Sequence, residues 1–223
     1  MKDHINNGPI RVPSDGVKPA GRVPRRKRQS RDERASEARE TIFRAATQVV
    51  GKYGYADASI NRITETAGIA QGTFYLYFES RQVLFDELLP HVGKDMLHFI
   101  RDRVKGAKDV LDTEEKGFRA FFEYMKENPG FFRILNEAEV AAPVAHKTHF
   151  KFLTDHYVES LERGLKSGEI SRFDRSELET LTYVLMSARS YLYLRYVKNA
   201  TEHASLPEKV IQTYMKIVRG GLR

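Results

Sequence analysis

The chain has 223 residues, of which 41% are apolar and 30% are charged, an ordinary composition for one or two globular domains. It contains no cysteine, which excludes disulfides, thiolate nucleophiles and cysteine-based metal sites. No apolar run approaches the ~18 residues of a membrane span, and the first residues hold no apolar signal-peptide core, so we expect a cytoplasmic protein with no membrane partner.

The formal net charge of +7 is concentrated at the start of the chain. Residues 1–31 hold nine basic and two acidic side chains, and the remainder sums to zero. This stretch is rich in proline and poor in apolar residues, so we expect residues 1–35 to form a disordered basic arm. Two interpretations stay open: a solubilising leader, or an arm that lies along DNA through Arg25, Arg26, Lys27 and Arg28.

Residues 36–88 predict a head of three short helices followed by the start of a fourth. Apolar spacing predicts a helix over 36–53, and Ser59 is placed to cap a helix over 60–66. Gly68 suits the tight turn after that helix, and a further helix is expected over 71–78. Ser80 then caps a longer helix, in which Pro90 predicts a kink or a break.

Residues 89–223 predict a larger bundle. Helices are expected over about 114–127, 130–140, 143–167, 174–198 and 206–219, the last closed by Gly220 and Gly221. The chain is therefore predicted to be all-α, with about nine helices in two blocks and no hairpin signals.

Two short helices joined by a glycine-containing turn are the layout of a helix-turn-helix, whose second helix enters the major groove of DNA. On the 71–78 helix, Phe74 and Phe78 are four residues apart and are predicted to face inward. Gln71, Thr73, Tyr75, Leu76 and Tyr77 then face outward, where hydroxyl groups suit phosphates and apolar groups suit thymine methyls.

The segment Gly72-Thr-Phe-Tyr-Leu-Tyr-Phe78, the preceding Ala67-Gly-Ile turn and the Ser80-Arg-x-x-Leu84 entry to the next helix resemble the TetR family of one-component regulators. The resemblance covers about 36–89. It implies that Gln71, Thr73 and Leu76 read base edges, and that Tyr75 and Tyr77 bind phosphate or a base. It also implies that Arg81, in place of the family's usual lysine, grips a phosphate, and that backbone or base contacts come from Ser59, Asn61 and Arg62.

The sequence departs from the family at Ala70, where a capping serine is usual, so the recognition helix is predicted to lack a side-chain cap. For residues 89–223, the resemblance implies a domain for effector binding and dimerisation. A lipophilic effector would suit an aromatic interior, for which the candidate lining residues are Phe118, Phe122, Phe132, Phe150, Tyr157, Met186 and Tyr193. A homodimer is expected through the last two helices, because two recognition helices read a palindromic DNA operator.

His146, His149 and His156, with Glu137 and Glu139 upstream, are the one grouping that suggests other chemistry. Their spacing matches no metal motif, and no phosphate loop or nucleophile elbow accompanies them. The leading hypothesis is a ligand-responsive regulator, usually a repressor in this family, with no cofactor, no metal and no enzymatic activity. The competing hypothesis is a helical-bundle metalloenzyme that uses the three histidines.

Overall fold

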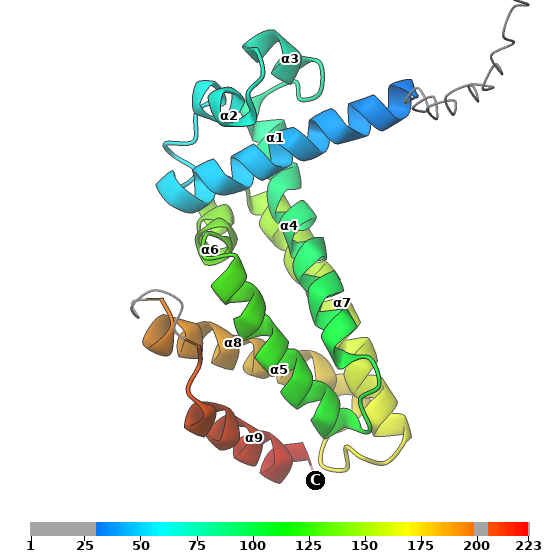
Figure 1. Ribbon diagram of the computed structural model, residues 1–223. Coiled ribbons are helices and arrows are strands. Elements are labelled where there is room, and N and C mark those ends of the chain that lie inside the picture. Colours follow the sequence, from blue (N-terminus) through cyan, green and yellow to red (C-terminus); the bar gives the residue numbers. More distant parts are fainter. Residues whose placement is uncertain (1–29, 199–204, 223) are drawn as a thin grey trace, which may run out of the picture.

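The computed structural model describes residues 30–198 and 205–222, and the regular structure within these ranges is helical throughout. Nine α-helices and one short 3-10 helix occur in these ranges, which confirms the all-α prediction. Figure 1 shows α1 lying across the top of the upright helices α4–α7, with α2 and α3 above it and α8 and α9 crossing at the foot. Among the described helices, none has both the length and the apolar character that a bilayer span requires.

Helix α1 spans Arg31–Tyr53 and therefore begins before residue 36, where it was predicted to start. The reason is a capping box: the Ser30 side chain accepts from the Glu33 backbone, and the Glu33 side chain accepts from the Ser30 backbone. Residues 31–35 thus belong to a helix and not to the expected arm. The basic residues Arg25, Arg26, Lys27 and Arg28 lie outside the described residues.

Helix α2 spans Ile60–Ala67 and ends at Gly68, which adopts the left-handed conformation at φ 67°. Helix α3 covers only Gln71–Tyr75, so the prediction of a helix to Phe78 was too long. Ala70 supplies no capping hydrogen bond, as predicted. After Tyr75 the chain tightens, because the Leu76 and Tyr77 N–H groups bond to carbonyls three residues back instead of four.

Helix α4 spans Arg81–Val104 and passes through Pro90 without a break. Ser80 caps it as predicted, accepting from the Val83 backbone at 3.2 Å. The helix survives because Leu89 and Val92 on either side of the proline are buried, and tertiary packing outweighs the local cost of proline. We call the bundle that follows the head the body. The head and the body share helix α4, because this helix crosses the boundary that was expected between residues 88 and 89.

The remaining helices are α5 (Val110–Glu127), α6 (Phe131–Ala141), α7 (Pro143–Lys166), the 3-10 helix Arg175–Glu177, α8 (Leu178–Tyr196) and α9 (Glu208–Leu222). Helix α5 begins earlier than residue 114 because Asp109 caps it through the Asp112 backbone. Helix α9 continues through Gly220 and Gly221, contrary to prediction, because Val218 and Leu222 are buried on one face of its last turn.

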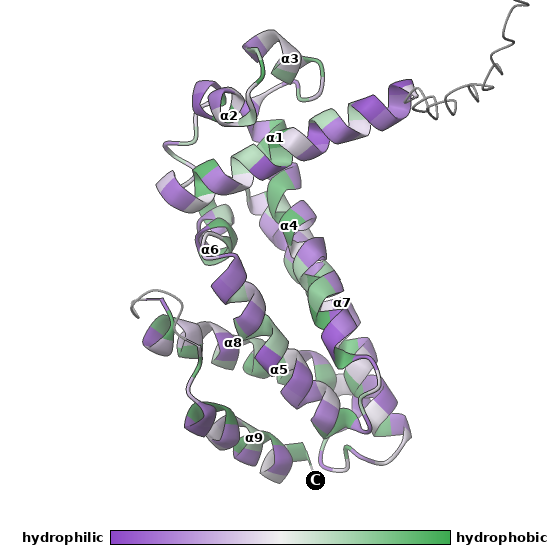
Figure 2. Cartoon of the chain, viewed as in Figure 1, coloured by the Kyte–Doolittle hydropathy of each residue, from purple (hydrophilic) through white to green (hydrophobic). Residues whose placement is uncertain are grey.

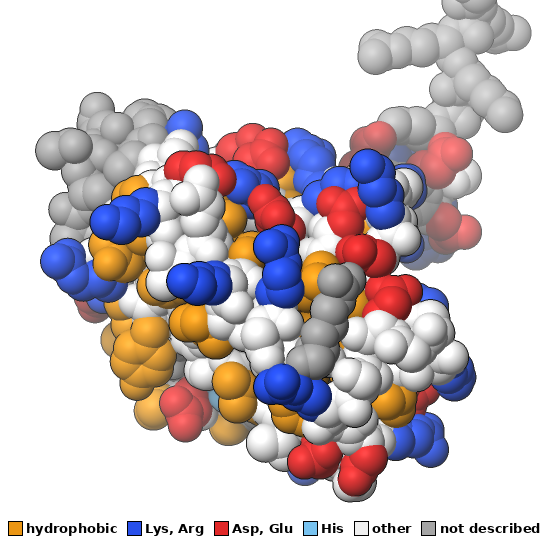
Figure 3. Space-filling view, turned by 90° about the horizontal axis from the view of Figure 1, so that it is seen from below, with side chains coloured by type: hydrophobic (Ala, Val, Ile, Leu, Met, Phe, Trp, Pro, Cys, Tyr) orange, Lys and Arg blue, Asp and Glu red, His pale blue; other side chains and the backbone are white. Residues whose placement is uncertain are grey.

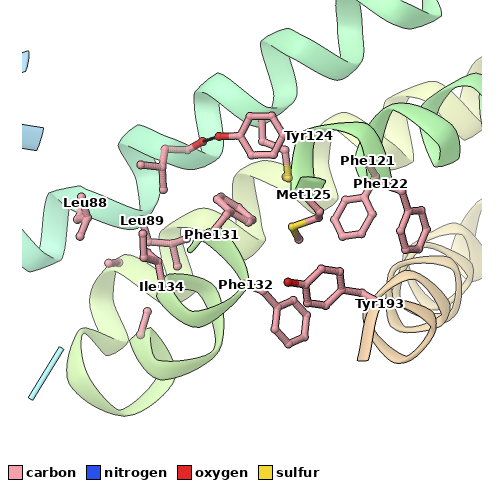
Figure 4. Close-up of a cluster of buried hydrophobic side chains, with 14 of the residues drawn as sticks. Leu88, Leu89, Phe121, Phe122, Tyr124, Met125, Phe131, Phe132, Ile134 and Tyr193 are labelled. Atoms are coloured by element: carbon pink, nitrogen blue, oxygen red, sulfur yellow. Dashed lines mark hydrogen bonds between the residues drawn. The ribbon is translucent and has the colours of Figure 1, made fainter. Parts of the chain in front are cut away.

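The core is continuous from the head to the body. Figure 2 shows the hydrophobic residues turned toward the helix–helix contacts, and Figure 4 shows side chains from α4, α5, α6 and α8 meeting in the middle. The head and the rest of the molecule therefore pack around one continuous core.

Candidate nucleic-acid interface and effector cavity

The outer face of α3 exposes large side chains. Phe74 and Phe78 are buried, as predicted, whereas Tyr75 is 54% and Leu76 is 76% exposed. Gln71 is also exposed, and Thr73 and Tyr77 are half-buried. A tyrosine and a leucine turned toward water form an unusual solvent face, and such a face suits contact with another molecule.

Polar side chains at the junction of α2 and α3 form a short hydrogen-bonded chain. Gln71 donates from Nε2 to Asn61 Oδ1 at 3.0 Å, and Asn61 donates from Nδ2 to Glu65 Oε1 at 2.7 Å. All three side chains are exposed. These hydrogen bonds hold the amides of Gln71 and Asn61 beside each other at the exposed junction of α2 and α3.

The other candidate residues flank this surface. Ser59 caps α2 by accepting from the Arg62 backbone at 3.3 Å. The Arg62 guanidinium donates to the Asp57 carbonyl at 3.0 Å and lies 4.8 Å from the Tyr53 ring. Arg81 is exposed at the start of α4, with its guanidinium 5.5 Å from the Phe85 ring.

Arg39 on α1, which was not among the residues predicted from the sequence, contacts the segment that follows α3. Its guanidinium donates to the Tyr77 carbonyl at 2.8 Å, pairs with Glu87 of α4 and lies 4.3 Å from the Phe78 ring. The available signal was an arginine four residues before the buried Phe43, on the inner side of the helix.

A cavity of about 400 Å³ lies in the body, within the ~300–1,000 Å³ range of small-molecule sites. Phe150, Tyr157 and Met186 line it, as proposed from the sequence. Phe118, Phe122, Phe132 and Tyr193 do not. They pack in the core instead. The ring centroids of Phe118 and Tyr214 are 3.9 Å apart in a stacked pair. Those of Phe132 and Tyr193 are 4.4 Å apart, as Figure 4 shows for these two rings. The apolar side chains that line the cavity include Met96, Ile100, Val104, Phe121, Phe131, Leu135, Leu153 and Leu161.

A buried ion pair lies at the inner side of the cavity. Arg189 Nη2 is 2.7 Å from Glu114 Oε1, and both side chains are less than a tenth exposed. Tyr157 and Tyr214 each donate a hydrogen bond to the Glu114 carboxylate. Burial raises the pKa of Tyr157 well above its usual value, so the phenol remains a donor. The sequence held a signal for this pair that was not used. Glu114 follows Leu111 by three residues and Arg189 follows Leu185 by four, so each charge falls on the apolar side of its helix.

The three histidines do not meet. His149 is buried against Gly93 of α4, and burial, with a smaller contribution from His146, lowers its pKa to about 4. His146 packs on the Phe150 ring at 4.5 Å, and His156 Nδ1 lies 2.8 Å from the Phe152 carbonyl. Within the described part of the chain, no three His, Asp or Glu residues are grouped to hold a metal. The structure therefore does not favour the metalloenzyme hypothesis.

The foot of the molecule exposes apolar side chains. Tyr183, Val184 and Tyr191 on α8 are 45%, 57% and 74% exposed, and Ile217 on α9 is 70% exposed. Figure 3, which views the molecule from below, shows hydrophobic side chains at the surface among charged ones. These are the two helices from which a dimer was predicted.

This arrangement defines a class of protein: a helix-turn-helix head joined through a shared helix to a body that encloses a cavity. Comparison with known proteins gives a family for the head. The model described as "Bacterial regulatory proteins, tetR family" matches residues 42–88. Residues 42–88, which hold the helix-turn-helix, therefore match the TetR family, and the chain is similar over most of its length to an HTH-type transcriptional regulator, YhgD of Bacillus subtilis, at 21% identity over 183 residues, 80% of this chain and 93% of that protein.

Individual relatives resemble different parts of the chain. The uncharacterized HTH-type transcriptional regulator YvdT of Bacillus subtilis is 42% identical over 67 residues, which is 30% of this chain and only 32% of that protein. The fatty acid degradation regulator FadR from Bacillus halodurans matches with a TM-score of 0.68 at 20% identity, covering 88% of this chain and 99% of that one. FadR from Bacillus subtilis, solved in complex with stearoyl-CoA, has a TM-score of 0.67 at 15% identity, covering 82% and 99%. At these identities, the two structural matches establish the fold alone.

Proposed function

We propose that this chain is a ligand-responsive transcriptional repressor, not an enzyme, which binds a palindromic DNA operator as a homodimer and is released by a small lipophilic effector. The observation that carries the proposal is the shared helix α4. It begins at Arg81, six residues after α3 ends, and continues as a wall of the cavity. A ligand that favours one position of α4 changes the placement of the recognition segment.

In the operator complex, Gln71, Thr73 and Leu76 read base edges, and Tyr75 and Tyr77 contact phosphates or bases. Arg81 contributes a cation to a phosphate, and Ser59, Asn61 and Arg62 contact the backbone or a base. The exposure of Tyr75, Leu76 and Gln71 supports these roles. The basic residues Arg25, Arg26, Lys27 and Arg28 add long-range attraction to the duplex.

The homodimer forms through α8 and α9. Its support is the set of exposed apolar side chains on these helices, which a second copy would cover. Two recognition segments related by a two-fold axis then read half-sites separated by a whole number of helical turns of DNA.

The effector occupies the cavity between α4, α5 and α7. Its support is the mainly apolar lining, together with the similarity of the fold to that of FadR from Bacillus subtilis, which was solved in complex with stearoyl-CoA. Phe150, Tyr157 and Met186 contact the ligand directly.

Selection of duplexes from a random-sequence library by the full-length protein tests the proposal. We expect enrichment of one palindrome, bound by two copies of the chain, with an affinity that falls as salt rises. Binding without sequence enrichment, or binding of the palindrome by a single copy, would contradict it.

A further inference from the structure

The cavity opens to solvent along the seam between α4 and α7. The side chains that line it there are exposed, in contrast to the buried Met96 and Leu161 deeper inside. The exposed lining side chains on α4 lie one or two turns apart. Lys94 and Arg101 are separated by about 10 Å along the helix axis, at ~1.5 Å of rise per residue. The charged and titratable members of this rim are Lys94, His98, Arg101, His156, Glu159 and Arg163.

The rim is basic. It holds three permanent cations, on Lys94, Arg101 and Arg163, and one carboxylate, on Glu159. By contrast, residues 32–223 as a whole carry no net charge. Arg163 approaches Glu159 at 3.8 Å, and both side chains are about two-thirds exposed, so this pair is weak. Within residues 30–198 and 205–222, neither Lys94 nor Arg101 makes a salt bridge or a side-chain hydrogen bond; Lys105, and more weakly Arg101, lower the pKa of the exposed Asp102 carboxylate, which pairs with Lys105. Two cations at the opening are therefore available to a ligand.

The interior offers no such cation. Arg189 is already neutralised by Glu114, whose oxygens also accept from Tyr157 and Tyr214. An anion brought to this end of the cavity would meet the Glu114 carboxylate in a desolvated setting, which is unfavourable. An anionic group therefore binds favourably at the opening, and an apolar group fills the interior.

We propose that the effector is an anionic amphiphile, whose apolar tail fills the cavity and whose carboxylate or phosphate head binds Lys94 and Arg101 on α4 and Arg163 on α7. The proposal rests on the effector cavity of the proposed function and adds the chemistry of the head and its orientation. A head held at the rim bridges α7 to α4, the helix that begins at the recognition segment.

Calorimetric titration of the full-length protein with four probes of one chain length tests the proposal. Laurate carries a carboxylate, dodecyl phosphate and lauroyl-CoA carry phosphate, and 1-dodecanol carries no charge. We expect each anionic probe that binds to do so at least tenfold more tightly than dodecanol, and the difference to shrink at high salt. Comparison of laurate with the phosphate-bearing probes distinguishes the two sources of the anion.

The variant Lys94→Gln/Arg101→Gln should lose the preference for anions and keep its affinity for dodecanol. The matched control Lys108→Gln/Lys166→Gln also removes two exposed cations, but from outside the cavity lining, and should keep the preference. Equal binding of dodecanol and the anions by the unmodified protein would overturn the proposal, as would a preference that survives in the rim variant or is lost equally in the control. Failure of all four probes to bind would instead overturn the lipophilic effector itself, and the rim proposal with it.

Discussion

The carboxylate of Glu137 on α6 accepts a hydrogen bond at 2.9 Å from the backbone N–H of Tyr55, which lies 82 positions earlier, in the loop between α1 and α2. Arg133, one turn away on α6, donates to the Lys52 carbonyl at the end of α1. The same helix contributes Phe131 and Leu135 to the cavity lining. Helix α6 therefore touches both the effector cavity and the base of the head.

Removal of this acceptor should destabilise the protein. Glu137→Ala leaves the partly buried Tyr55 N–H without its partner, and we expect the free energy of unfolding to fall by about 1–3 kcal/mol. Chemical denaturation measures the change. Glu139→Ala, at an exposed position of the same helix, is the control and should alter stability by less than about 0.5 kcal/mol. Equal stability of the two variants would show that the contact contributes nothing.

A second contact between α1 and α6 requires two glycines. A Cβ atom at Gly130 would lie 2.7 Å from the Gly51 Cα, closer than backbone atoms can approach. Gly130→Ala should therefore separate the helices and lower the unfolding free energy by about 1–3 kcal/mol. Gly72→Ala, where a Cβ meets open space, should leave stability unchanged or raise it by up to ~1 kcal/mol. Thermal unfolding of the two variants separates a steric effect from a general effect of alanine.

The proposed DNA contacts predict losses of affinity without loss of fold. Arg81→Ala should weaken binding to all duplexes by a similar factor and reduce the slope of log affinity against log salt by about 1, because one phosphate contact is removed. Tyr75→Phe should also weaken binding, because it removes the hydroxyl group that is proposed to contact a phosphate or a base. Fluorescence anisotropy on a selected operator measures both effects. Arg103→Ala, at the far end of α4, is the control, and affinity unchanged in all three variants would refute the contact assignments.

Burial of His149 predicts a loss of stability in acid. Its pKa is lowered from 6.5 to about 4, so the unfolded chain binds a proton between these values and the folded chain does not. Stability from this residue is complete above pH 6.5 and falls as the pH drops toward 4, by at most about 3 kcal/mol. Denaturation curves across this range check the prediction. His149→Leu should flatten the dependence, and an unchanged slope in that variant would assign the acid sensitivity to other groups.

Local signals were sufficient to predict the head. Ser59 caps α2, Gly68 adopts a positive φ angle, and Phe74 and Phe78 turn inward, because each outcome depends on a few neighbouring residues. The boundaries were less accurate where packing competes with local preference. Pro90 and the pair Gly220–Gly221 lie inside helices because the buried side chains around them stabilise the helical conformation.

The sequence by itself determined the class of protein, since the helical periodicity, the turn glycine and the recognition segment are written in consecutive residues. The membership of the cavity was decided only by the tertiary structure. Periodicity identifies the side of a helix that faces inward, but it does not show what an inward side chain meets. Phe118 packs on the Tyr214 ring, whereas Phe150 lines the cavity. That difference depends on the spacing between helices far apart in the chain, as does the meeting of Glu114 with Arg189 across 75 residues.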